Sequence, residues 1–389
     1  MGQNIITNIL LYLQIAVVLV LSILTIITLS NLKYLRRLRS YKFSATWPRI
    51  SVLVPARNEE ENIGKCVSSL LKQDYPDFQL IVLDDNSNDK TWEILQEFAR
   101  RDDRLKIIKG KPLPDDWLGK HWACHQLFEE ADGELLLFVD ADTIHEPDML
   151  KYAASAMYEE NASLISVLPQ QIVISWSELL SIPAFYLGML CGVPLGLTRL
   201  QRNPLLFACL GQFLMFRREA YVAAGGYASV RQNIVDDLAI GRRIHSMGLC
   251  YRLLDGHKLI YCRMYNTFEQ VWKGLTKSTF ATFDFNPFFI TSIYLLIILI
   301  FLSPPVILLS SYAFHNLPVV MLITAGIALL LIIIIWIISN LRFHFPLYLV
   351  LIYPASVTFM VIIAMASMVL TIQGKATWKG RNMPRFVKL

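Results

Sequence analysis

Long apolar runs at both ends of the chain constrain its fold more than any other feature. One run covers Ile9–Leu29, and three more cover approximately residues 287–310, 318–338 and 345–371. A helix of about twenty apolar residues can cross the hydrocarbon core of a bilayer. Basic residues follow the first run and no small-residue cleavage site is present, so we expect a retained anchor rather than a cleaved signal peptide.

The middle of the chain has a different composition. Of all residues 54% are apolar, yet 17% are charged, and most charges lie between Lys33 and Lys277. This uneven mixture excludes both a purely soluble enzyme and a purely intramembrane transporter. We expect a membrane anchor with a basic segment at 1–47, a folded domain at 48–286, and membrane segments with a basic tail at 287–389.

The net charge of +5 gathers beside the apolar ends. Basic clusters in these places suit anionic lipid headgroups, and the sequence contains no nucleic-acid-binding module. The positive-inside preference predicts a multi-pass protein of the cell membrane whose folded domain is cytoplasmic, and six cysteines without CxxC spacing agree with a reducing compartment. The clusters are Lys33, Arg36, Arg37, Arg39 and Lys42 after the first run, and Lys375, Lys379, Arg381, Arg385 and Lys388 after the last.

The membrane topology of the C-terminal part stays open. Three C-terminal spans would leave the basic tail outside, against the positive-inside preference. A re-entrant first run, interrupted at Pro304-Pro305, would bring the tail back to the cytoplasm.

Short apolar runs alternate with helical stretches between Pro48 and Tyr261. Strands are predicted at 50–54, 80–83, 106–108, 135–139 and 211–217, and helices at 59–72, 91–100 and about 121–131. This alternation indicates an α/β domain with a mostly parallel, Rossmann-like sheet. Ligands of such sheets bind beyond the carboxyl ends of the strands.

Two further segments are predicted to lie at the membrane surface. Residues 177–200 are apolar but interrupted by Pro183 and Gly188, which favours an interfacial helix pair over a span. Residues 268–285 are amphipathic and aromatic, a composition typical of interfacial helices.

Asp140-Ala141-Asp142 directly follows the apolar strand at 135–139. Two carboxylates with this spacing can bind one hard cation, Mg²⁺ or Mn²⁺, which shares its ligand shell with phosphate groups. Such a cation neutralises charge on a leaving diphosphate. An isolated triplet is as readily a turn or a helix cap, and the buried strand before it favours the functional interpretation.

Polar residues also follow the first two strands. Asp84-Asp85 ends the second strand and predicts contacts to a nucleobase and ribose, or a turn in which Asn88 or Asp89 caps the helix at Thr91. The segment 55–60 precedes the first helix, whose N-terminus favours an anionic ligand.

These motifs resemble those of family 2 glycosyltransferases with the GT-A fold, over roughly residues 48–280. The motifs are VLVPARNE from Val52, VLDDNS from Val82, Gly119-Lys120, Asp132-Gly133-Glu134 and FVDAD from Phe138. Three further segments resemble a bacterial membrane-bound subgroup of this family, which includes hopanoid-associated and carotenoid-acid (diaponeurosporenoate-type) glycosyltransferases. They are Pro112-Leu113-Pro114, residues 117–123 and Trp378-Lys379-Gly380-Arg381.

The resemblance implies roles by position. Asp140 would approach the ribose and Asp142 the metal, and Lys120 would lie near the nucleotide or diphosphate. The donor, a UDP-sugar by resemblance, would also be bound by Pro55, Ala56, Asn58, Glu59, Asp84 and Asp85.

Val235-Asp236-Asp237-Leu238 resembles the Glu-Asp motif of the family, which implies that Asp237 is the general base and that Asp236 lies beside it. An inverting transfer needs a carboxylate that takes the proton of the acceptor hydroxyl while the anomeric carbon is attacked. From the residues alone, an acidic helix cap is the alternative.

The chain departs from processive relatives such as cellulose and hyaluronan synthases. These carry Gln-x-x-Arg-Trp where this chain has the segment 269–274, with Gln270, Trp272 and Lys273 in a different order. Lys273 is a candidate for neutralising the diphosphate, or an interfacial lysine with its stem along apolar surface. His125, His145, His245 and His257 lack metal-ligand spacing and are predicted to be structural.

The sequence thus predicts an inverting, metal-dependent hexosyltransferase that moves a sugar from a nucleotide-sugar to a membrane lipid or isoprenoid-type acceptor. Two other functions stay open. One is a processive polysaccharide synthase, which the altered motif at 269–274 disfavours. The other is a transporter or scaffold with an inactive nucleotide-binding domain, although the long apolar runs lack the buried charges of a transport path.

Overall fold

The computed structural model describes residues 2–43, 46–200, 207–313, 317–378 and 381–382. The chain divides into two compact units. The sheet unit consists of Tyr34–Ile172 and Leu195–Met264, and the helical unit of Met1–Lys33, Val173–Pro194 and Tyr265–Leu389.

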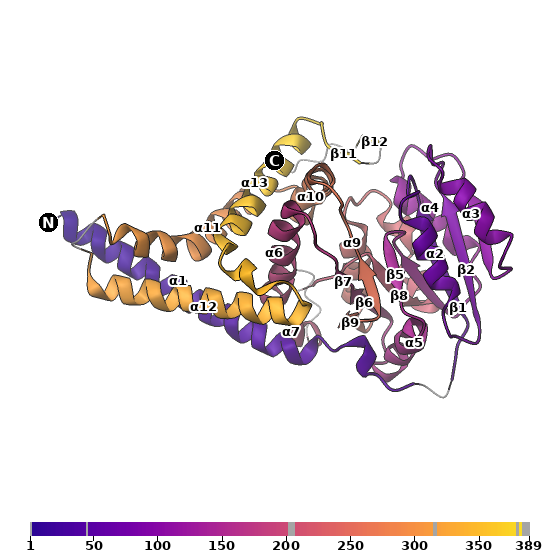
Figure 1. Cartoon of the computed structure of the whole chain (residues 1–389), viewed down its shortest axis with the longest axis horizontal. Coiled ribbons are helices and arrows are strands. Elements are labelled where there is room, and N and C mark those ends of the chain that lie inside the picture. The colour runs from indigo at the N-terminus through magenta and orange to yellow at the C-terminus, as the bar shows by residue number, and fades with distance from the viewer. Residues whose placement is uncertain (1, 44–45, 201–206, 314–316, 379–380, 383–389) are drawn as a thin grey trace. The chain divides into compact units, whose positions relative to one another are not determined.

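A seven-stranded sheet with the strand order β3-β2-β1-β4-β8-β6-β9 forms the centre of the sheet unit (Figure 1). Neighbouring strands are parallel except β8, which is antiparallel to both β4 and β6. The predicted mostly parallel α/β fold is therefore confirmed. The strands are β1 (Ile50–Ala56), β2 (Phe78–Asp84), β3 (Leu105–Lys109), β4 (Leu135–Val139), β6 (Leu164–Leu168), β8 (Phe213–Arg217) and β9 (Tyr251–Asp255).

A second, three-stranded sheet lies in the same unit. Its central strand β10 (Ile260–Cys262) is antiparallel to β5 (Thr143–His145) and parallel to β7 (Gln170–Gln171). Because β5 follows β4 after three residues, this small sheet holds the far end of the Asp140–Asp142 turn.

Helices and 3₁₀ turns surround the strands. They are η1 (Leu38–Ser40), α2 (Ile63–Leu71), α3 (Thr91–Ala99), α4 (Gly119–Glu129), α5 (Met149–Glu159), α7 (Leu195–Thr198), α8 (Arg218–Ala223), η2 (Tyr227–Val230) and α9 (Asp236–Ser246). The helix predicted at 59–72 begins only at Ile63. The N–H groups of Glu59 and Glu60 instead donate to side chains of the next loop, those of Thr91 and Asp89, at 2.8 and 3.0 Å.

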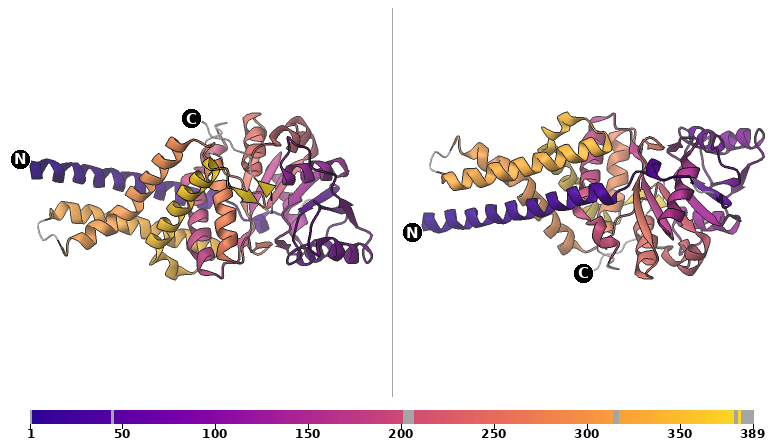
Figure 2. Two further views of the ribbon diagram at one scale, coloured as in Figure 1. Left: turned by 90° about the horizontal axis from the view of Figure 1, so that it is seen from above. Right: turned by 90° about the horizontal axis from the view of Figure 1, so that it is seen from below.

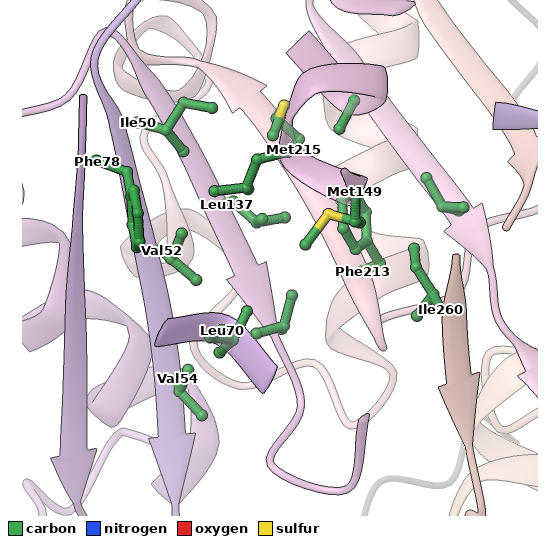
Figure 3. Close-up of a cluster of buried hydrophobic side chains, with 14 of the residues drawn as sticks. Ile50, Val52, Val54, Leu70, Phe78, Leu137, Met149, Phe213, Met215 and Ile260 are labelled. Carbon is green, nitrogen blue, oxygen red and sulfur yellow. The ribbon is translucent and has the colours of Figure 1, made fainter. Parts of the chain in front are cut away.

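Buried apolar side chains on alternate strand positions form the core of the sheet unit. Each fully buried side chain of this kind contributes about 1.5–3 kcal/mol relative to an exposed one. Figure 3 labels ten members of the cluster, which come from strands and from α2 and α5: Ile50, Val52, Val54, Leu70, Phe78, Leu137, Met149, Phe213, Met215 and Ile260.

The strand register aligns the ends from which the predicted site residues come. Ala56 on β1 lies opposite Asp84 on β2, and Leu53 lies opposite Phe138 on β4. The carboxyl ends of β1, β2 and β4 therefore meet at one edge of the sheet. At the opposite edge, Gly133 packs so closely that a Cβ there would lie 2.5 Å from the backbone nitrogen of Ser51, which explains the glycine of the Asp-Gly-Glu motif.

The helical unit contains four helices long and apolar enough to cross a membrane, by length and composition, among the residues that the structure describes. Its helices are α1 (Gly2–Tyr34), α6 (Trp176–Gly192), α10 (Phe268–Thr282), α11 (Pro287–Ser310), α12 (Val319–Phe343), η3 (Leu347–Val350) and α13 (Tyr353–Ile372), followed by the short strands β11 (Thr377–Trp378) and β12 (Arg381–Asn382). Both views in Figure 2 show α11 and α12 side by side.

Hydrogen bonds between helices hold this unit together. Asn31 is buried in α1 and donates to the carbonyls of Leu190 and Val193, both at 2.7 Å. The Ser367 hydroxyl of α13 accepts from the N–H of Phe280 in α10 at 2.9 Å. Buried side-chain contacts of this kind are typical of helix packing without a hydrophobic driving force.

Two details of the helical unit differ from the sequence prediction. The run at 345–371 is not one helix, because η3 and a turn precede α13, which starts only at Tyr353. The interruption considered at Pro304-Pro305 is not seen, because α11 continues as one helix through both prolines. Lys379 and Gly380 of the predicted closing motif, and Arg385 and Lys388 of the basic tail, lie outside the described residues.

Candidate active site

Hydrogen bonds join the loops that follow β1 and β2. The N–H of Asn58 donates to Ser87 Oγ at 2.9 Å, and Asn58 Oδ1 accepts from the N–H of Asn88 at 2.9 Å. Asn58 has a φ of 51°, a left-handed conformation that asparagine tolerates. The two loops predicted to bind the nucleotide are therefore adjacent, and their backbones are fixed to each other.

Asp84 ends β2 with a fully buried side chain. Its Oδ1 accepts from the N–H of Ser87 at 3.2 Å, while Oδ2 has no hydrogen-bond partner within the described part of the chain. The neighbouring Asp85 is also buried, and its N–H donates to the carbonyl of Ala56 at 2.8 Å. A buried carboxylate oxygen without a partner is costly, so a hydrogen-bond donor on a ligand would be stabilised here.

Hydrogen bonds of Thr143 with Asp140 and His145 fix the Asp140–Asp142 turn. The carbonyl of Asp140 accepts from the Thr143 hydroxyl at 2.7 Å, and the hydroxyl oxygen lies 2.9 Å from His145 Nε2. Because the hydroxyl hydrogen is used on Asp140, His145 must donate from Nε2. Burial lowers the pKa of His145 to about 3, so the imidazole is neutral at physiological pH.

The charges of three acidic side chains raise the pKa of two buried thiols. Burial, followed by the charge of Asp142, raises the pKa of both Cys66 and Cys262, and the charges of Glu59 and Asp140 act in the same direction. These shared effects indicate that Glu59, Asp140 and Asp142 lie in one neighbourhood.

The donor atoms of Asp140 and Asp142 fit a hard divalent cation. Mg²⁺ in proteins is commonly held by one or two carboxylates together with the phosphates of the substrate. Within the described ranges, no group of three His, Cys, Asp or Glu side chains could hold a metal ion by itself. The predicted metal role of Asp142 and Asp140 therefore stays a prediction that involves substrate phosphates as further ligands.

Lys120 connects this turn with a second acidic pair. Its Nζ, in the first turn of α4, lies 2.8 Å from Asp140 Oδ1 and 3.4 Å from Asp236 Oδ2. Burial alone would lower the pKa of Lys120, but the charges of Asp140 and Asp236 outweigh burial and raise it well above its usual value. Lys120 is therefore a permanent cation between the ends of β4 and α9.

The second residue of this acidic pair, Asp237, has a strongly raised proton affinity. Burial, followed by the neighbouring charge of Asp236, raises its pKa to about 7, although Lys120 opposes the shift. Its Oδ1 accepts from the N–H of Leu238 at 2.8 Å. A carboxylate with a pKa near neutrality is suited to act as a general base.

The predicted alternative for this acidic pair was a helix cap. The N-cap residue of α9 is Val235, and Asp236 and Asp237 occupy the first helical turn. Negative charges in this turn are favoured by the helix dipole, so the pair has a structural reason to be here as well as a possible chemical one.

Lys273 belongs to α10 in the helical unit. It is exposed and forms an ion pair with Glu269, one helical turn earlier, at 2.5 Å. Its predicted contact with a diphosphate stays a prediction.

Sequence reasoning missed several residues that shape the site. The Gln212 side-chain amide donates to Cys262 Sγ at 2.9 Å. The backbone carbonyl of Gln212 accepts from the N–H of Asp140 at 3.4 Å. A Cβ on Gly211 would lie 3.3 Å from Asp237 Oδ2. The Gly-Gln pair at the start of a predicted strand was the available signal, but its partners come from distant segments that no spacing rule connects.

This sheet, with carboxylates at the ends of β2 and β4, defines an α/β domain of the GT-A type. A match to the family described as Glycosyl transferase family 2 covers residues 51–223. Residues 51–223 therefore match a family 2 glycosyltransferase domain, and the recognition from the motifs is confirmed.

Two relatives illustrate the similarity in sequence. Both are 4,4′-diaponeurosporenoate glycosyltransferases. The protein from Staphylococcus haemolyticus is 26% identical over 235 residues, 60% of this chain and 61% of that protein. A protein from Staphylococcus aureus is 29% identical over 232 residues, 59% of this chain and 60% of that protein. The aligned part spans about three fifths of these relatives.

A solved structure supports the fold independently. The mannosyltransferase from Pyrobaculum calidifontis, determined in complex with GDP-Man and Mn²⁺, superimposes with a TM-score of 0.53 at 16% identity. The match covers 93% of this chain and 98% of that one. At this identity the likeness establishes the fold.

Proposed function

We propose that this protein is an inverting, metal-dependent glycosyltransferase that moves a hexose from a nucleotide-sugar, a UDP-sugar, to a membrane lipid or isoprenoid-type acceptor. The observation that carries the proposal is Lys120, whose ammonium lies within 3.4 Å of carboxylates from both Asp140 and Asp236. This contact supports a single site that contains the donor-side turn and the candidate base Asp237, the residue after Asp236.

The donor half consists of the loops after β1, β2 and β4. The unpartnered Oδ2 of Asp84 would accept a hydrogen bond from the nucleobase, and Asp85 and Asp140 would contact the ribose. Pro55, Ala56, Asn58 and Glu59 would line the same pocket. Lys120 would carry positive charge to the diphosphate, and Lys273 stays a second candidate for that role.

Asp142, with Asp140, would hold a divalent cation together with the phosphates. When bound, Mg²⁺ or Mn²⁺ would supply neutralisation of the negative charge on the leaving nucleoside diphosphate. The Mn²⁺ and GDP-Man in the structurally similar mannosyltransferase support this assignment.

Asp237 would perform the proton transfer. Its carboxylate would take the proton from the acceptor hydroxyl as that oxygen forms a bond to the anomeric carbon. The bond between this carbon and the diphosphate oxygen breaks on the opposite face, so the configuration is inverted. Asp236 would keep the proton affinity of Asp237 high through its negative charge.

A membrane acceptor is supported by two observations. The relatives in the sequence comparison are named for a carotenoid-acid acceptor, diaponeurosporenoate. Four helices of this chain have the length and composition of membrane spans among the described residues. A donor from the cytosol and an acceptor dissolved in the bilayer must meet at the membrane surface, where α6 and α10 are proposed to lie, with the catalytic domain cytoplasmic. The domain limits at 47/48 and 286/287 belong to the same proposal.

Mass spectrometry of the host lipid fraction, with and without the gene, tests the function. We expect a lipid that carries a single hexose-sized mass increment only when the gene is active, and its loss in the Asp142→Ala variant. A ladder of increments would instead identify a polymerising enzyme. Identical lipid profiles with and without the gene would overturn the proposal.

A further inference from the structure

One ammonium group lies between the two halves of the candidate site. Lys120 Nζ is 2.8 Å from Asp140 Oδ1 and 3.4 Å from Asp236 Oδ2. Asp140 directly follows β4, whereas Asp236 starts α9 and directly precedes Asp237. Lys120 itself comes from a third element, α4, so the three segments meet at a single cation.

The two contacts differ in strength. The contact with Asp140 has the length of a charge-assisted hydrogen bond, whereas 3.4 Å to Asp236 is a longer and weaker one. The side chain of Lys120 is 36% exposed, and that of Asp236 is 13% exposed. A lysine has three N–H donors on a flexible four-carbon stem, so an anion that reaches this ammonium can replace the weaker partner.

We propose that Lys120 couples donor binding to the acceptor half of the site, because the diphosphate of the donor competes with Asp236 for the Lys120 ammonium and thereby weakens the contact between Lys120 and Asp236. This inference rests on the proposed function, since it needs a nucleoside diphosphate at this site. When Lys120 turns from Asp236 to the diphosphate, less of the negative charge of Asp236 beside Asp237 is compensated. A neighbouring negative charge strengthens the proton affinity of a carboxylate, so the base becomes stronger when the donor has arrived.

The coupling has a consequence that requires neither an acceptor nor turnover. If Asp236 and the diphosphate compete for the Lys120 ammonium, removing the charge of Asp236 leaves Lys120 more available to the diphosphate. Nucleotide binding then becomes tighter. That gain must disappear when Lys120 is absent. A general electrostatic effect of Asp236 on an anionic ligand would instead be the same with and without Lys120.

Calorimetric titration of the purified full-length protein with UDP in Mn²⁺-containing buffer measures this cycle. The variants are Asp236→Asn, Lys120→Gln and the double variant, with Lys120→Met as a second charge-free background. Asp132→Asn is the matched control. Its carboxylate pairs with Arg49 at 2.8 Å, just before β4 begins, at the opposite edge of the sheet.

We expect Asp236→Asn to tighten UDP binding about three- to tenfold when Lys120 is present. In either charge-free background the same substitution leaves UDP affinity unchanged, and Asp132→Asn behaves as the unaltered protein. Equal tightening with and without Lys120, or no tightening at all, overturns the coupling alone. Failure of the unaltered protein to bind either UDP or GDP overturns the proposed donor class, and the coupling with it.

Discussion

The hydroxyl of Thr143 lies 2.9 Å from Nε2 of the buried His145 and donates its hydrogen to the carbonyl of Asp140. The direction of both hydrogen bonds is fixed, because a backbone carbonyl can only accept. Thr143 is therefore a brace between the second sheet and the turn that carries Asp140 and Asp142. Neither residue was assigned a role at the site from the sequence, where His145 was predicted to be structural.

Thr143→Val should weaken the metal response of the enzyme. Valine keeps the shape of threonine but removes both hydrogen bonds, so the turn loses its support and His145 loses its acceptor. Loss of supporting hydrogen bonds around a metal site typically lowers metal affinity or activity by about 10- to 100-fold. The Mn²⁺ dependence of UDP release measures the effect, and Thr143→Ser is the control that should retain the normal response. Equal behaviour of the valine and serine variants would contradict the bracing role.

Asp142→Ala should abolish transfer while the protein stays folded. The variant removes a predicted metal ligand from the turn and leaves the strand before it intact. UDP release should then no longer respond to added Mn²⁺, as measured by titration of the metal against activity. Asp115→Ala, a substitution at an exposed aspartate, is the matched control and should respond as the unaltered protein does. A normal Mn²⁺ response in the Asp142 variant would remove this residue from the metal site.

The pH dependence of the rate should report Asp237. Burial and the charge of Asp236 raise its pKa to about 7, and a base acts only when it is deprotonated. The rate should therefore fall as the pH decreases through about 7. Asp236→Asn removes a charge that raises the pKa, so its falling limb should move to lower pH. The measurement is kcat/KM for sugar transfer as a function of pH, and a limb that does not move in Asp236→Asn would argue against this origin.

Glu160 should stabilise the sheet unit above mildly acidic pH. Its side chain is 8% exposed and accepts from Arg252 at 2.7 Å, Tyr41 at 2.8 Å and Arg36 at 3.0 Å. Burial alone would raise its pKa, but these hydrogen bonds and the charge of Arg199 lower it from 4.5 to about 2. Because the folded pKa is depressed, the stabilisation is present above pH 4.5 and is lost as the pH falls towards 2.

Glu160→Gln should therefore lower the free energy of unfolding by about 1–3 kcal/mol at neutral pH, since it removes the negative charge that the partly exposed Arg36, Arg199 and Arg252 share. Thermal unfolding of the purified full-length protein at neutral pH and at about pH 3 measures this. The difference between the variant and the unaltered protein should shrink at the lower pH. A difference that is the same at both pH values would show that lost charge is not the cause.

The fold could be predicted largely because strand signals are local. The strand predicted at 135–139 is β4 (Leu135–Val139), and the run at 287–310 is α11 (Pro287–Ser310). The predicted helix boundaries were wrong where hydrogen bonds to side chains of another segment determine where the helix begins. The N–H groups of Glu59 and Glu60 bind Thr91 and Asp89 instead of starting a helix, and periodicity cannot reveal such partners. The N-cap residue of α3 is Lys90 and not Asn88 or Asp89, although Asp89 Oδ1 accepts from the N–H of Thr91, the first residue of the helix, at 3.0 Å.

The candidate site could be predicted only in pieces. Asp84 and Asp140 were singled out because they lie at the ends of predicted strands, whereas Asp237 was singled out because Asp236-Asp237 resembles the Glu-Asp motif of the family. The contacts of Lys120 with both Asp140 and Asp236 were not predicted, because the resemblance implied only that Lys120 lies near the donor. The supporting residues Gln212 and Gly211 were missed because they act through tertiary contacts.

Transfer of a sugar from a UDP-sugar to extracted host lipid, by the purified protein and its Asp237→Asn variant, tests the central claim most directly. Asparagine keeps the size of the side chain but cannot take the proton, so the account predicts a decrease in the transfer rate of about 10²- to 10⁴-fold. UDP affinity of the variant, measured in parallel, should stay close to that of the unaltered protein. Near-normal transfer by Asp237→Asn would contradict the assignment of the base, and absence of any Mn²⁺-dependent transfer by the unaltered protein would contradict the proposed activity.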